Sequence, residues 1–329
     1  MSRLKKRRFW GAVVLALVLP PLIIFAILSF IEERNELTEE IRARAPGSFI
    51  SLSKGTVHYL LAGDTSSPLL IFIHGGGVSG LEVWKKNIPY FASKHFCVLA
   101  YDLYGRGYSD RPHQTNSPLL FQMQLDELLS KLKLKKPYCI VAMSMGAIIA
   151  LDYVNANSCS LHKLVLIDPA ATGDFQLNGL LKIPIISSFM MTVGWYPRAL
   201  ENQRKEFFNE KLFDEDYAKR LSYFMDFKGY KFTMHSTWIH MLNQNRLDQF
   251  NKPAKLDMLL VYGAQDPYFN RRDCVHYQKQ IPFIQVVKID SAGHMPHYEK
   301  PDQVNKVIYS FLSGNVFSVG VPALNNQKH

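Results

Sequence analysis

Cysteine is scarce in this chain of 329 residues, which contains only Cys97, Cys139, Cys159 and Cys274. No two of them form a C-x-x-C pair, and none has the Cys/His spacing of a zinc site. Neither a disulfide framework nor a bound metal is therefore indicated. Cys97 and Cys139 lie inside apolar runs typical of buried strands, where a thiol behaves as a small hydrophobic group. These two cysteines are expected to serve packing.

Several patterns that mark other classes of protein are also missing. The chain has no fixed-period repeat and no low-complexity stretch, which argues against a repeat architecture. It has no G-x-G-x-x-G fingerprint, and no Lys-Ser or Lys-Thr pair follows its run of three glycines. A phosphate-binding glycine loop is therefore the weaker interpretation of that run.

Acidic charge is lacking at the N-terminus, and half of the net charge of +10 comes from five cations before residue 9. They are Arg3, Lys5, Lys6, Arg7 and Arg8. The remaining 33 basic residues outnumber the 28 acidic residues by only five. A surface this mildly basic, without a nucleic-acid motif, predicts no nucleic-acid partner.

Residues 9–31 contain no charged side chain at all over 23 positions. About 20 apolar residues in a helix span the hydrocarbon core of a bilayer, so we expect a transmembrane anchor after a basic tail at residues 1–8. Pro20 and Pro21 are expected to kink this helix, which membrane helices tolerate. Cations precede the segment and glutamates follow it. By the positive-inside rule the N-terminus is cytoplasmic and the rest of the chain is extracytoplasmic, in the periplasm if the source is bacterial.

A cleaved signal peptide is the alternative interpretation of this segment. Its apolar region would be about twice the usual 7–15 residues. The nearest small-x-small site, Ala43-Arg44-Ala45, lies well beyond the apolar run and is followed by Pro46. We therefore favour an uncleaved anchor, joined to the rest of the chain by a polar linker at residues 32–47.

Short apolar runs alternate with helical stretches from residue 48 onward. FISLS and VHYLLAG, separated by Lys54-Gly55-Thr56, predict an opening hairpin. Further strands are predicted at LLIFIHG, FCVLAYD, YCIVAMS, LVLID, DMLLVYG and IQVVKID. Helices are expected around 84–92, 118–132, 146–156 and 301–312. This alternation predicts a doubly wound α/β sheet, mostly parallel, over residues 48–170 and 255–313.

The alternation stops between residues 171 and 254, which contain no clear strand pair but many aromatic residues and methionines. Periodic apolar positions from 198 to 245 predict several helices. We interpret this region as an inserted helical cap. The alternative is a helical packing layer without a role in substrate binding. Residues 314–329 remain as a C-terminal tail.

Ser144 stands in Ala142-Met143-Ser144-Met145-Gly146, directly between a predicted strand and a predicted helix. A nucleophile elbow places a serine on such a sharp turn, with small residues at both ends of the motif. The usual first residue is glycine, and alanine at 142 is a small departure. The pattern makes Ser144 the candidate nucleophile.

His74-Gly75-Gly76-Gly77 ends an earlier predicted strand. Glycines let backbone N–H groups approach a ligand without interference from Cβ atoms. In acyl transfer such donors stabilise the developing oxyanion, by about 3–4 kcal/mol for one donor. We expect the oxyanion hole to consist of the N–H groups of Gly76 and Met145.

Asp266 and His294 each follow one of the last two predicted strands, in Tyr-Gly-Ala-Gln-Asp-Pro and Ser-Ala-Gly-His-Met-Pro. A histidine there can take the serine proton, and an aspartate can hold its imidazole in the required tautomer. All these groups follow strands, and ligands of doubly wound sheets bind at that edge. Asp168 after another strand is an alternative acid, and His297 is an alternative histidine.

Together with Asp102-Leu103-Tyr104-Gly105-Arg106-Gly107-Tyr108-Ser109, these motifs resemble the α/β-hydrolase superfamily over residues 48–313. The set is similar to its membrane-anchored branch of monoacylglycerol-lipase-like and carboxylesterase-like enzymes. Carbon–carbon bond hydrolases of aromatic-ring degradation share much of the pattern. The resemblance implies an eight-stranded sheet with a cap, no cofactor, and hydrolysis through a covalent acyl-enzyme. Serine at 144 argues against haloalkane dehalogenase and epoxide hydrolase relatives, which use aspartate there.

The resulting hypothesis is a serine hydrolase with Ser144, Asp266 and His294 as its triad. The anchor and the aromatic-rich cap favour a lipophilic ester, such as a monoacylglycerol or a short-chain lipid, with the bilayer as a partner. Two alternatives stay open, because a fold does not choose its chemistry. They are carbon–carbon bond hydrolysis of a vinylogous diketone and a receptor that has lost turnover.

Overall fold

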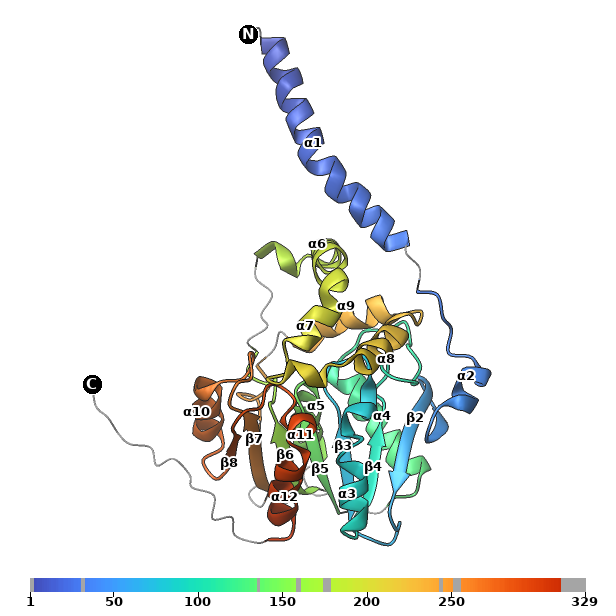
Figure 1. Ribbon diagram of the computed structural model, residues 1–329, viewed down its shortest axis with the longest axis vertical. Coiled ribbons are helices and arrows are strands. Elements are labelled where there is room, and N and C mark those ends of the chain that lie inside the picture. Colours follow the sequence, from blue (N-terminus) through green and yellow to red (C-terminus); the bar gives the residue numbers. More distant parts are fainter. Residues whose placement is uncertain are drawn as a thin grey trace, which may run out of the picture.

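The structure is a computed structural model that describes residues 3–30, 33–134, 137–157, 161–173, 179–242, 245–250 and 256–314. Within these residues the centre is an eight-stranded sheet in the order β1-β2-β4-β3-β5-β6-β7-β8 (Figure 1). Its strands are β1 (Ser48–Leu52), β2 (Gly55–Ala62), β3 (Leu69–Ile73), β4 (Cys97–Tyr101), β5 (Tyr138–Met143), β6 (Leu161–Ile167), β7 (Asp257–Gly263) and β8 (Gln285–Ile289). The β1–β2 and β2–β4 pairs are antiparallel and the others parallel. The predicted sheet and its opening hairpin are confirmed.

Each face of the sheet carries its own apolar layer. In β3, Leu69, Ile71 and Ile73 belong to one buried cluster, and Leu70 and Phe72 belong to the other. Successive side chains of a strand point to opposite faces, which produces this division. The first layer includes α4 (Pro118–Lys131), α5 (Met145–Asn157) and α10 (Arg271–Gln280), and the second includes α3 (Ile88–Ser93) and α12 (Pro301–Leu312). Helices on both faces explain why the central strands are continuously apolar.

Most predicted core helices lie within one residue of their expected bounds. The helix expected around 84–92 is divided into a 3₁₀ turn, η1 (Gly80–Trp84), and α3. Helix α10 was not predicted from the sequence. Only Asp273, Cys274 and Tyr277 of its ten residues are buried. So few apolar positions give no recognisable helical period.

At the N-terminus, α1 (Arg3–Phe30) runs through Pro20 and Pro21 as one helix and projects from the rest of the molecule (Figure 1). Among the described residues it is the one helix with an apolar stretch long enough to cross a membrane, Lys6–Ile27. The segment after it, interpreted from the sequence as a linker, contains α2 (Glu39–Arg44). Arg42 of α2 donates to Asp110 at 2.5 Å, which fastens this segment to the core.

The region between β6 and β7 is helical where the structure describes it. It contains η3 (Gly179–Lys182), α6 (Pro184–Met190), the π-helical turn η4 (Met191–Trp195), η5 (Tyr196–Arg198), α7 (Ala199–Arg204), η6 (Glu210–Leu212), α8 (Glu215–Met225) and α9 (Tyr230–His240). These elements cover one edge of the sheet (Figure 1). The same edge carries the loops that follow β3, β5, β7 and β8.

Candidate active site

Ser144 occupies a strained turn between β5 and α5. Its φ is +50°, in the left-handed region that side chains disfavour by about 1–3 kcal/mol. Its N–H donates to Ile167 O on β6 at 2.9 Å, which fixes the turn. A Cβ on Gly146 would lie 2.6 Å from Ile73 O, so only glycine lets α5 approach β3 this closely. The sequence motif therefore forms the sharp elbow that it predicted.

A chain of hydrogen bonds links the three candidate triad residues. Ser144 Oγ lies 3.0 Å from His294 Nε2, and His294 Nδ1 lies 2.7 Å from Asp266 Oδ2. The side chains of His294 and Asp266 are 7% and 0% exposed. This network assigns the proton of the neutral ring to Nδ1, which leaves Nε2 to accept the serine hydroxyl.

The electrostatics of the pair favour a charged imidazole. Burial opposes the charge on His294, but attraction and the hydrogen bond from Asp266, followed by the charge of Glu206, raise the pKa of His294. Burial also opposes ionisation of Asp266. The charge and hydrogen bond of His294, with further hydrogen bonds, outweigh it and lower the pKa of Asp266. The site can therefore accept a proton at His294 with Asp266 ionised.

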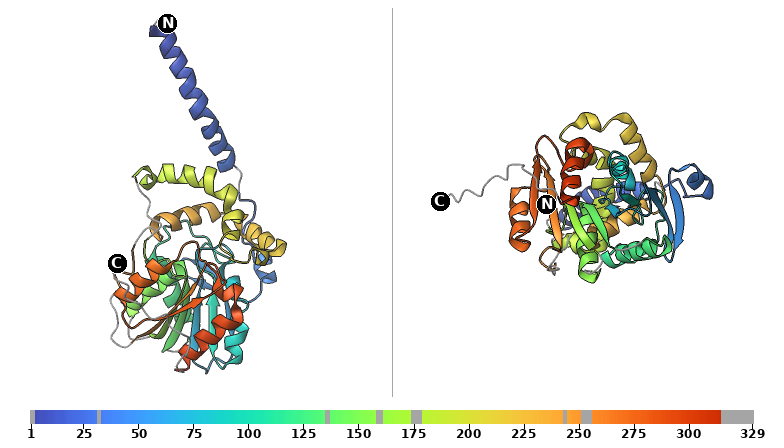
Figure 2. Two further views of the ribbon diagram at one scale, coloured as in Figure 1. Left: turned by 60° about the vertical axis from the view of Figure 1, so that its left-hand side comes forward. Right: turned by 90° about the horizontal axis from the view of Figure 1, so that it is seen from below.

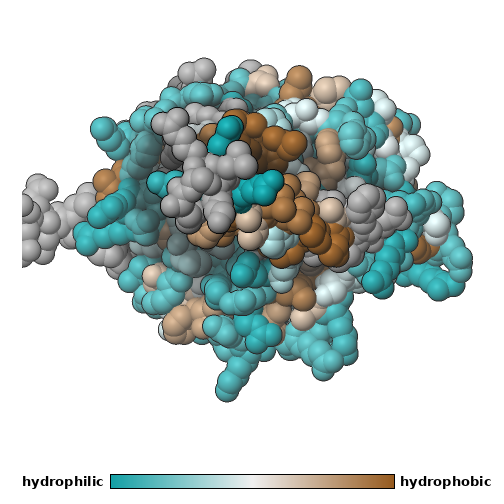
Figure 3. Space-filling model, turned by 90° about the horizontal axis from the view of Figure 1, so that it is seen from above, coloured by the Kyte–Doolittle hydropathy of each residue, from teal (hydrophilic) through white to brown (hydrophobic). Residues whose placement is uncertain are grey.

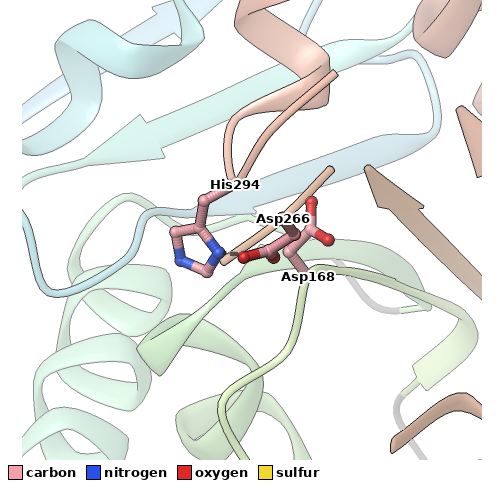
Figure 4. A group of neighbouring side chains, drawn as sticks. All are labelled: Asp168, Asp266 and His294. Carbon is pink, nitrogen blue, oxygen red and sulfur yellow. Dashed lines mark hydrogen bonds and ion pairs between the residues drawn. The ribbon is translucent and has the colours of Figure 1, made fainter. Parts of the chain in front are cut away.

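Asp168, the alternative acid, lies behind Asp266. Figure 4 shows the His294 ring pointing at the Asp266 carboxylate, with Asp168 beside it. Asp168 Oδ1 accepts from Gly263 N at 3.0 Å, and its buried Oδ2 has no hydrogen-bond partner among the described residues. Burial, then the charge and hydrogen bond of Asp266, raise the pKa of Asp168 well above its usual value. Burial and the neighbouring carboxylate therefore favour the protonated form of Asp168.

Two aspartates and a histidine within 4.8 Å of one another also form the donor set of a metal site. Here the Nδ1 of His294 is committed to Asp266, and the raised pKa of Asp168 favours its protonated form. A protonated carboxyl group relieves the repulsion between two close carboxylates and is thus an alternative to a bound cation.

His297, the alternative histidine, lies inside the core. Its ring is packed against Trp84, with ring centres 4.4 Å apart, and it is fully buried. Burial lowers the pKa of His297 to about 3, so it is neutral. It is three residues from His294 in the chain but contributes nothing to the cavity beside Ser144.

His74 holds the glycine loop in place. Its Nε2 accepts from Leu103 N at 3.0 Å, and its Nδ1 donates to Gly75 O at 2.7 Å. Burial lowers the pKa of His74 to about 4, which keeps the ring neutral for both bonds. A Cβ on Gly75 would lie 3.1 Å from Ser144 Cβ, and one on Gly76 would lie 3.9 Å from the Met145 side chain. Gly76 and Met145 are thus neighbours, as the oxyanion hypothesis requires.

A cavity of about 420 Å³ opens above Ser144 and His294. The core supplies its floor, with the glycine loop and the two side chains. The cap supplies an apolar roof, which consists of Met191, Trp195, Leu200, Leu221, Met225, Met234, Trp238 and Leu242. The cap is therefore more than a packing layer, because its side chains line the same space as the candidate nucleophile.

Glu206 and Gln203 add a polar corner that no sequence motif indicated. Both line the cavity, and the Gln203 amide donates to the Glu206 carboxyl. Burial raises the pKa of Glu206 to about 7 against the opposing attraction of His294. The backbones of the two residues are also hydrogen-bonded, since His294 N donates to Glu206 O at 2.7 Å. In the sequence these residues stand in a charged run that resembles a solvated helix face.

Arg106 connects the cap to the core through hydrogen bonds. It is fully buried, and its guanidinium donates to Thr237 Oγ1 on α9 at 2.6 Å and to Tyr104 O at 3.2 Å. Burial lowers the pKa of Arg106 to about 9, so it stays charged at neutral pH. The Asp102–Ser109 segment, which the sequence offered only as part of a resemblance, thus positions the cap.

Residues 68–301 match the model of a protein family described as alpha/beta hydrolase fold. Epoxide hydrolase 1 of Caenorhabditis elegans is 22% identical over 289 residues, which cover 80% of this chain and 70% of that protein. A Haemophilus influenzae protein, named provisionally as an esterase/lipase, is 24% identical over 253 residues, covering 76% of this chain and 85% of its own.

Among solved structures, a mutant of the meta-cleavage product hydrolase from Pseudomonas fluorescens has a TM-score of 0.66 and 20% identity. The match covers 82% of this chain and 98% of that one. The names of these three proteins describe different hydrolytic reactions. Their likeness supports a hydrolase and leaves the substrate to the site itself.

Proposed function

This chain belongs to the alpha/beta hydrolase fold family, and on that premise we propose that it is a serine hydrolase that cleaves a carboxylic ester through an acyl-enzyme. The observation that carries the proposal is the hydrogen-bonded chain from Ser144 through His294 to Asp266, which opens into a cavity. A binding protein needs no such chain. Serine rather than aspartate at the elbow favours an ester over an epoxide.

In the proposed reaction Ser144 Oγ attacks the ester carbonyl while His294 Nε2 takes the hydroxyl proton. The N–H groups of Gly76 and Met145 stabilise the negative oxygen. Met145 is the first residue of α5, so its N–H has no partner inside the helix. The tetrahedral intermediate collapses to the acyl-enzyme, and the proton on His294 passes to the departing alcohol.

Water then releases the acyl group in a second half-reaction, in which it takes the place of the departed alcohol. His294 takes a proton from the water as its oxygen attacks the acyl carbon, and returns that proton to Ser144 as the acid is released. Asp266 stays ionised throughout, since its lowered pKa matches that role. The enzyme is unchanged at the end, and no redox partner is required.

The substrate proposed for this site is a lipophilic ester, such as a monoacylglycerol or a short-chain lipid. The apolar roof supports an acyl chain, and the Gln203–Glu206 corner supports a polar group near the reacting carbon. We further propose that α1 anchors the enzyme in a bilayer, with its N-terminus cytoplasmic and the hydrolase on the far side. Protease added to the cytoplasmic side of intact membranes should then leave the hydrolase domain whole.

The test of the reaction is hydrolysis of p-nitrophenyl esters of increasing acyl length by the full chain. We expect turnover in the wild type and its loss in Ser144→Ala, with no loss in Ser66→Ala, which changes an exposed loop serine. A fluorophosphonate probe should label the wild type and not Ser144→Ala. If the folded protein turns over no ester, the ester proposal is wrong. A vinylogous diketone substrate would then separate a carbon–carbon hydrolase from a receptor.

A further inference from the structure

The outer surface of the cap carries an unusual concentration of exposed apolar side chains. Leu180, Ile183, Ile185 and Met190 are 68%, 44%, 72% and 48% exposed. All four lie in η3, in α6 or directly between them. Figure 3 views the molecule from this side, where α1 projects toward the viewer in front of the cap. Single exposed apolar residues are ordinary on soluble proteins, but a cluster marks an interaction surface.

Helix α6 is amphipathic in the reverse sense to a helix on a soluble protein. Its inward side carries Ser187, which is fully buried. The Ser187 hydroxyl lies 2.9 Å from His235 Nε2 on α9 and 3.0 Å from Pro184 O. These bonds fix which side of α6 faces inward, and Ile185, at 100° per residue, lies on the opposite side of the helix. Met190 is the last residue of α6 and is exposed there. A helix that satisfies its polar group internally and exposes isoleucine is suited to an apolar surrounding.

The apolar helix α1 lies against this segment. The rings of Phe25 and Phe189 are 5.3 Å apart. Figure 2 (left) shows α6 across the top of the hydrolase domain, with α1 rising from beside it. Phe25 belongs to the apolar stretch Lys6–Ile27, two residues from its end. If that stretch spans a bilayer, Phe189 and therefore α6 lie at the boundary where the span ends.

The length of the stretch agrees with that placement. Its 22 residues extend about 33 Å at 1.5 Å per residue, close to the ~30 Å hydrocarbon core. Phe25 then lies at the edge of the core rather than in its middle. Helix α6 would therefore lie at the interface, where amphipathic helices bury one side and keep the other in polar surroundings.

We propose that η3 and α6 dock on the membrane surface through Leu180, Ile183, Ile185 and Met190, so that the cavity above Ser144 is loaded directly from the lipid phase. The partner is a phospholipid bilayer. The proposal rests on the proposed anchoring role of α1. Two independent observations converge on it: the apolar span, and the reversed polarity of the helix that the span contacts.

The chain also shows how docking and substrate loading would be coupled. Met191 and Trp195 follow α6 directly in the π-helical turn η4, and both line the cavity. One continuous segment thus has apolar side chains toward the outside in α6 and toward the cavity in η4. An acyl chain that leaves the bilayer at α6 would meet the apolar roof within one or two helical turns.

The test uses the full chain, with Cys159→Ala, reconstituted in phosphatidylcholine vesicles. The other cysteines, Cys97, Cys139 and Cys274, are buried. A bimane label is placed at Ile185→Cys or at Val275→Cys, a matched exposed β-branched site on α10 in the core. We expect nitroxide lipids to quench the label at 185 several-fold more than the label at 275. Equal quenching of both labels by aqueous iodide, with none by the lipids, would overturn the proposal.

A kinetic arm separates docking from catalysis. Ile185→Glu should lower the rate on an ester embedded in vesicles by about tenfold, because a carboxylate does not partition into the interface. It should leave the hydrolysis of soluble p-nitrophenyl acetate unchanged, and Val275→Glu should change neither rate. Equal rates of Ile185→Glu and wild type on the embedded ester would contradict docking. If the folded wild type turned over no ester at all, the proposed reaction would be refuted, and the quenching experiment would still decide whether α6 docks on the membrane.

Discussion

The floor and the roof of the cavity are held in different ways. Ser144 on the floor and Asp168 behind it both have φ in the left-handed region, and backbone hydrogen bonds to neighbouring strands hold them there. The roof is a set of methionine, tryptophan and leucine side chains joined to the core at a few polar points, such as Arg106 with Thr237. A rigid floor fixes reacting atoms, while an apolar roof selects what reaches them. Substitutions on the floor should therefore change kcat, and those on the roof should change substrate preference.

The largest effect should come from Asp266→Asn on the floor. Asparagine would favour the wrong tautomer of His294, so we expect kcat to fall by about 10³–10⁴-fold with KM little changed. Steady-state kinetics on a soluble ester would measure it, with Tm as the control for folding. A kcat within tenfold of the wild type would show that Asp266 is not the acid of the triad, and would return Asp168 to that role.

Substitutions of Asp168 test the same contrast between the floor and the roof of the cavity. The raised pKa of Asp168 favours a protonated carboxyl group that can donate to Asp266, so Asp168→Asn should keep a donor and tolerate the positive φ, with kcat within a few-fold of the wild type. Asp168→Ala removes the donor and should lower kcat by about tenfold or more. Unfolding curves of both variants separate this loss from instability. If asparagine is as damaging as alanine, Asp168 acts as an anion and the assignment is wrong.

A smaller effect is expected on the roof from Trp195→Ala. Removing the indole enlarges the cavity, so the preferred acyl chain should become longer and kcat/KM for the original optimum should fall by about fivefold. Hydrolysis of p-nitrophenyl acetate, which is too short to reach the roof, is the internal reference. A uniform loss across all chain lengths would argue that the roof supports the floor instead of selecting substrates.

The smallest effect should be a shift in pH dependence from Glu206→Gln, where roof and floor meet. Glu206 raises the pKa of His294, and turnover requires the neutral ring. Activity is therefore lost as pH falls through the pKa of His294. Without the carboxylate, that pKa should fall, which moves the acidic limb of kcat/KM to lower pH by less than about one unit. An acidic limb that moves to higher pH would contradict this placement of Glu206.

The sequence indicated the floor well because its motifs are local. The elbow at Ser144, the glycine loop and the two loops with Asp266 and His294 each lie directly after a strand that a short apolar run predicts. The sequence did not predict helix α10, because only three of its residues are buried. The roof was predicted as a group of helices, but nothing in the sequence distinguished residues that line the cavity from residues that pack.

The sequence by itself determined the doubly wound sheet, the order of the candidate catalytic residues and the apolar N-terminal helix, because strand burial, turns and membrane spans depend on neighbouring residues. Only the tertiary structure decided that Asp266 rather than Asp168 contacts His294, that His297 is a core residue, and that Glu206 enters the cavity. It also decided that α6 exposes its apolar side. Each of these depends on distances between groups far apart in the chain, and such distances are set by packing rather than by local pattern.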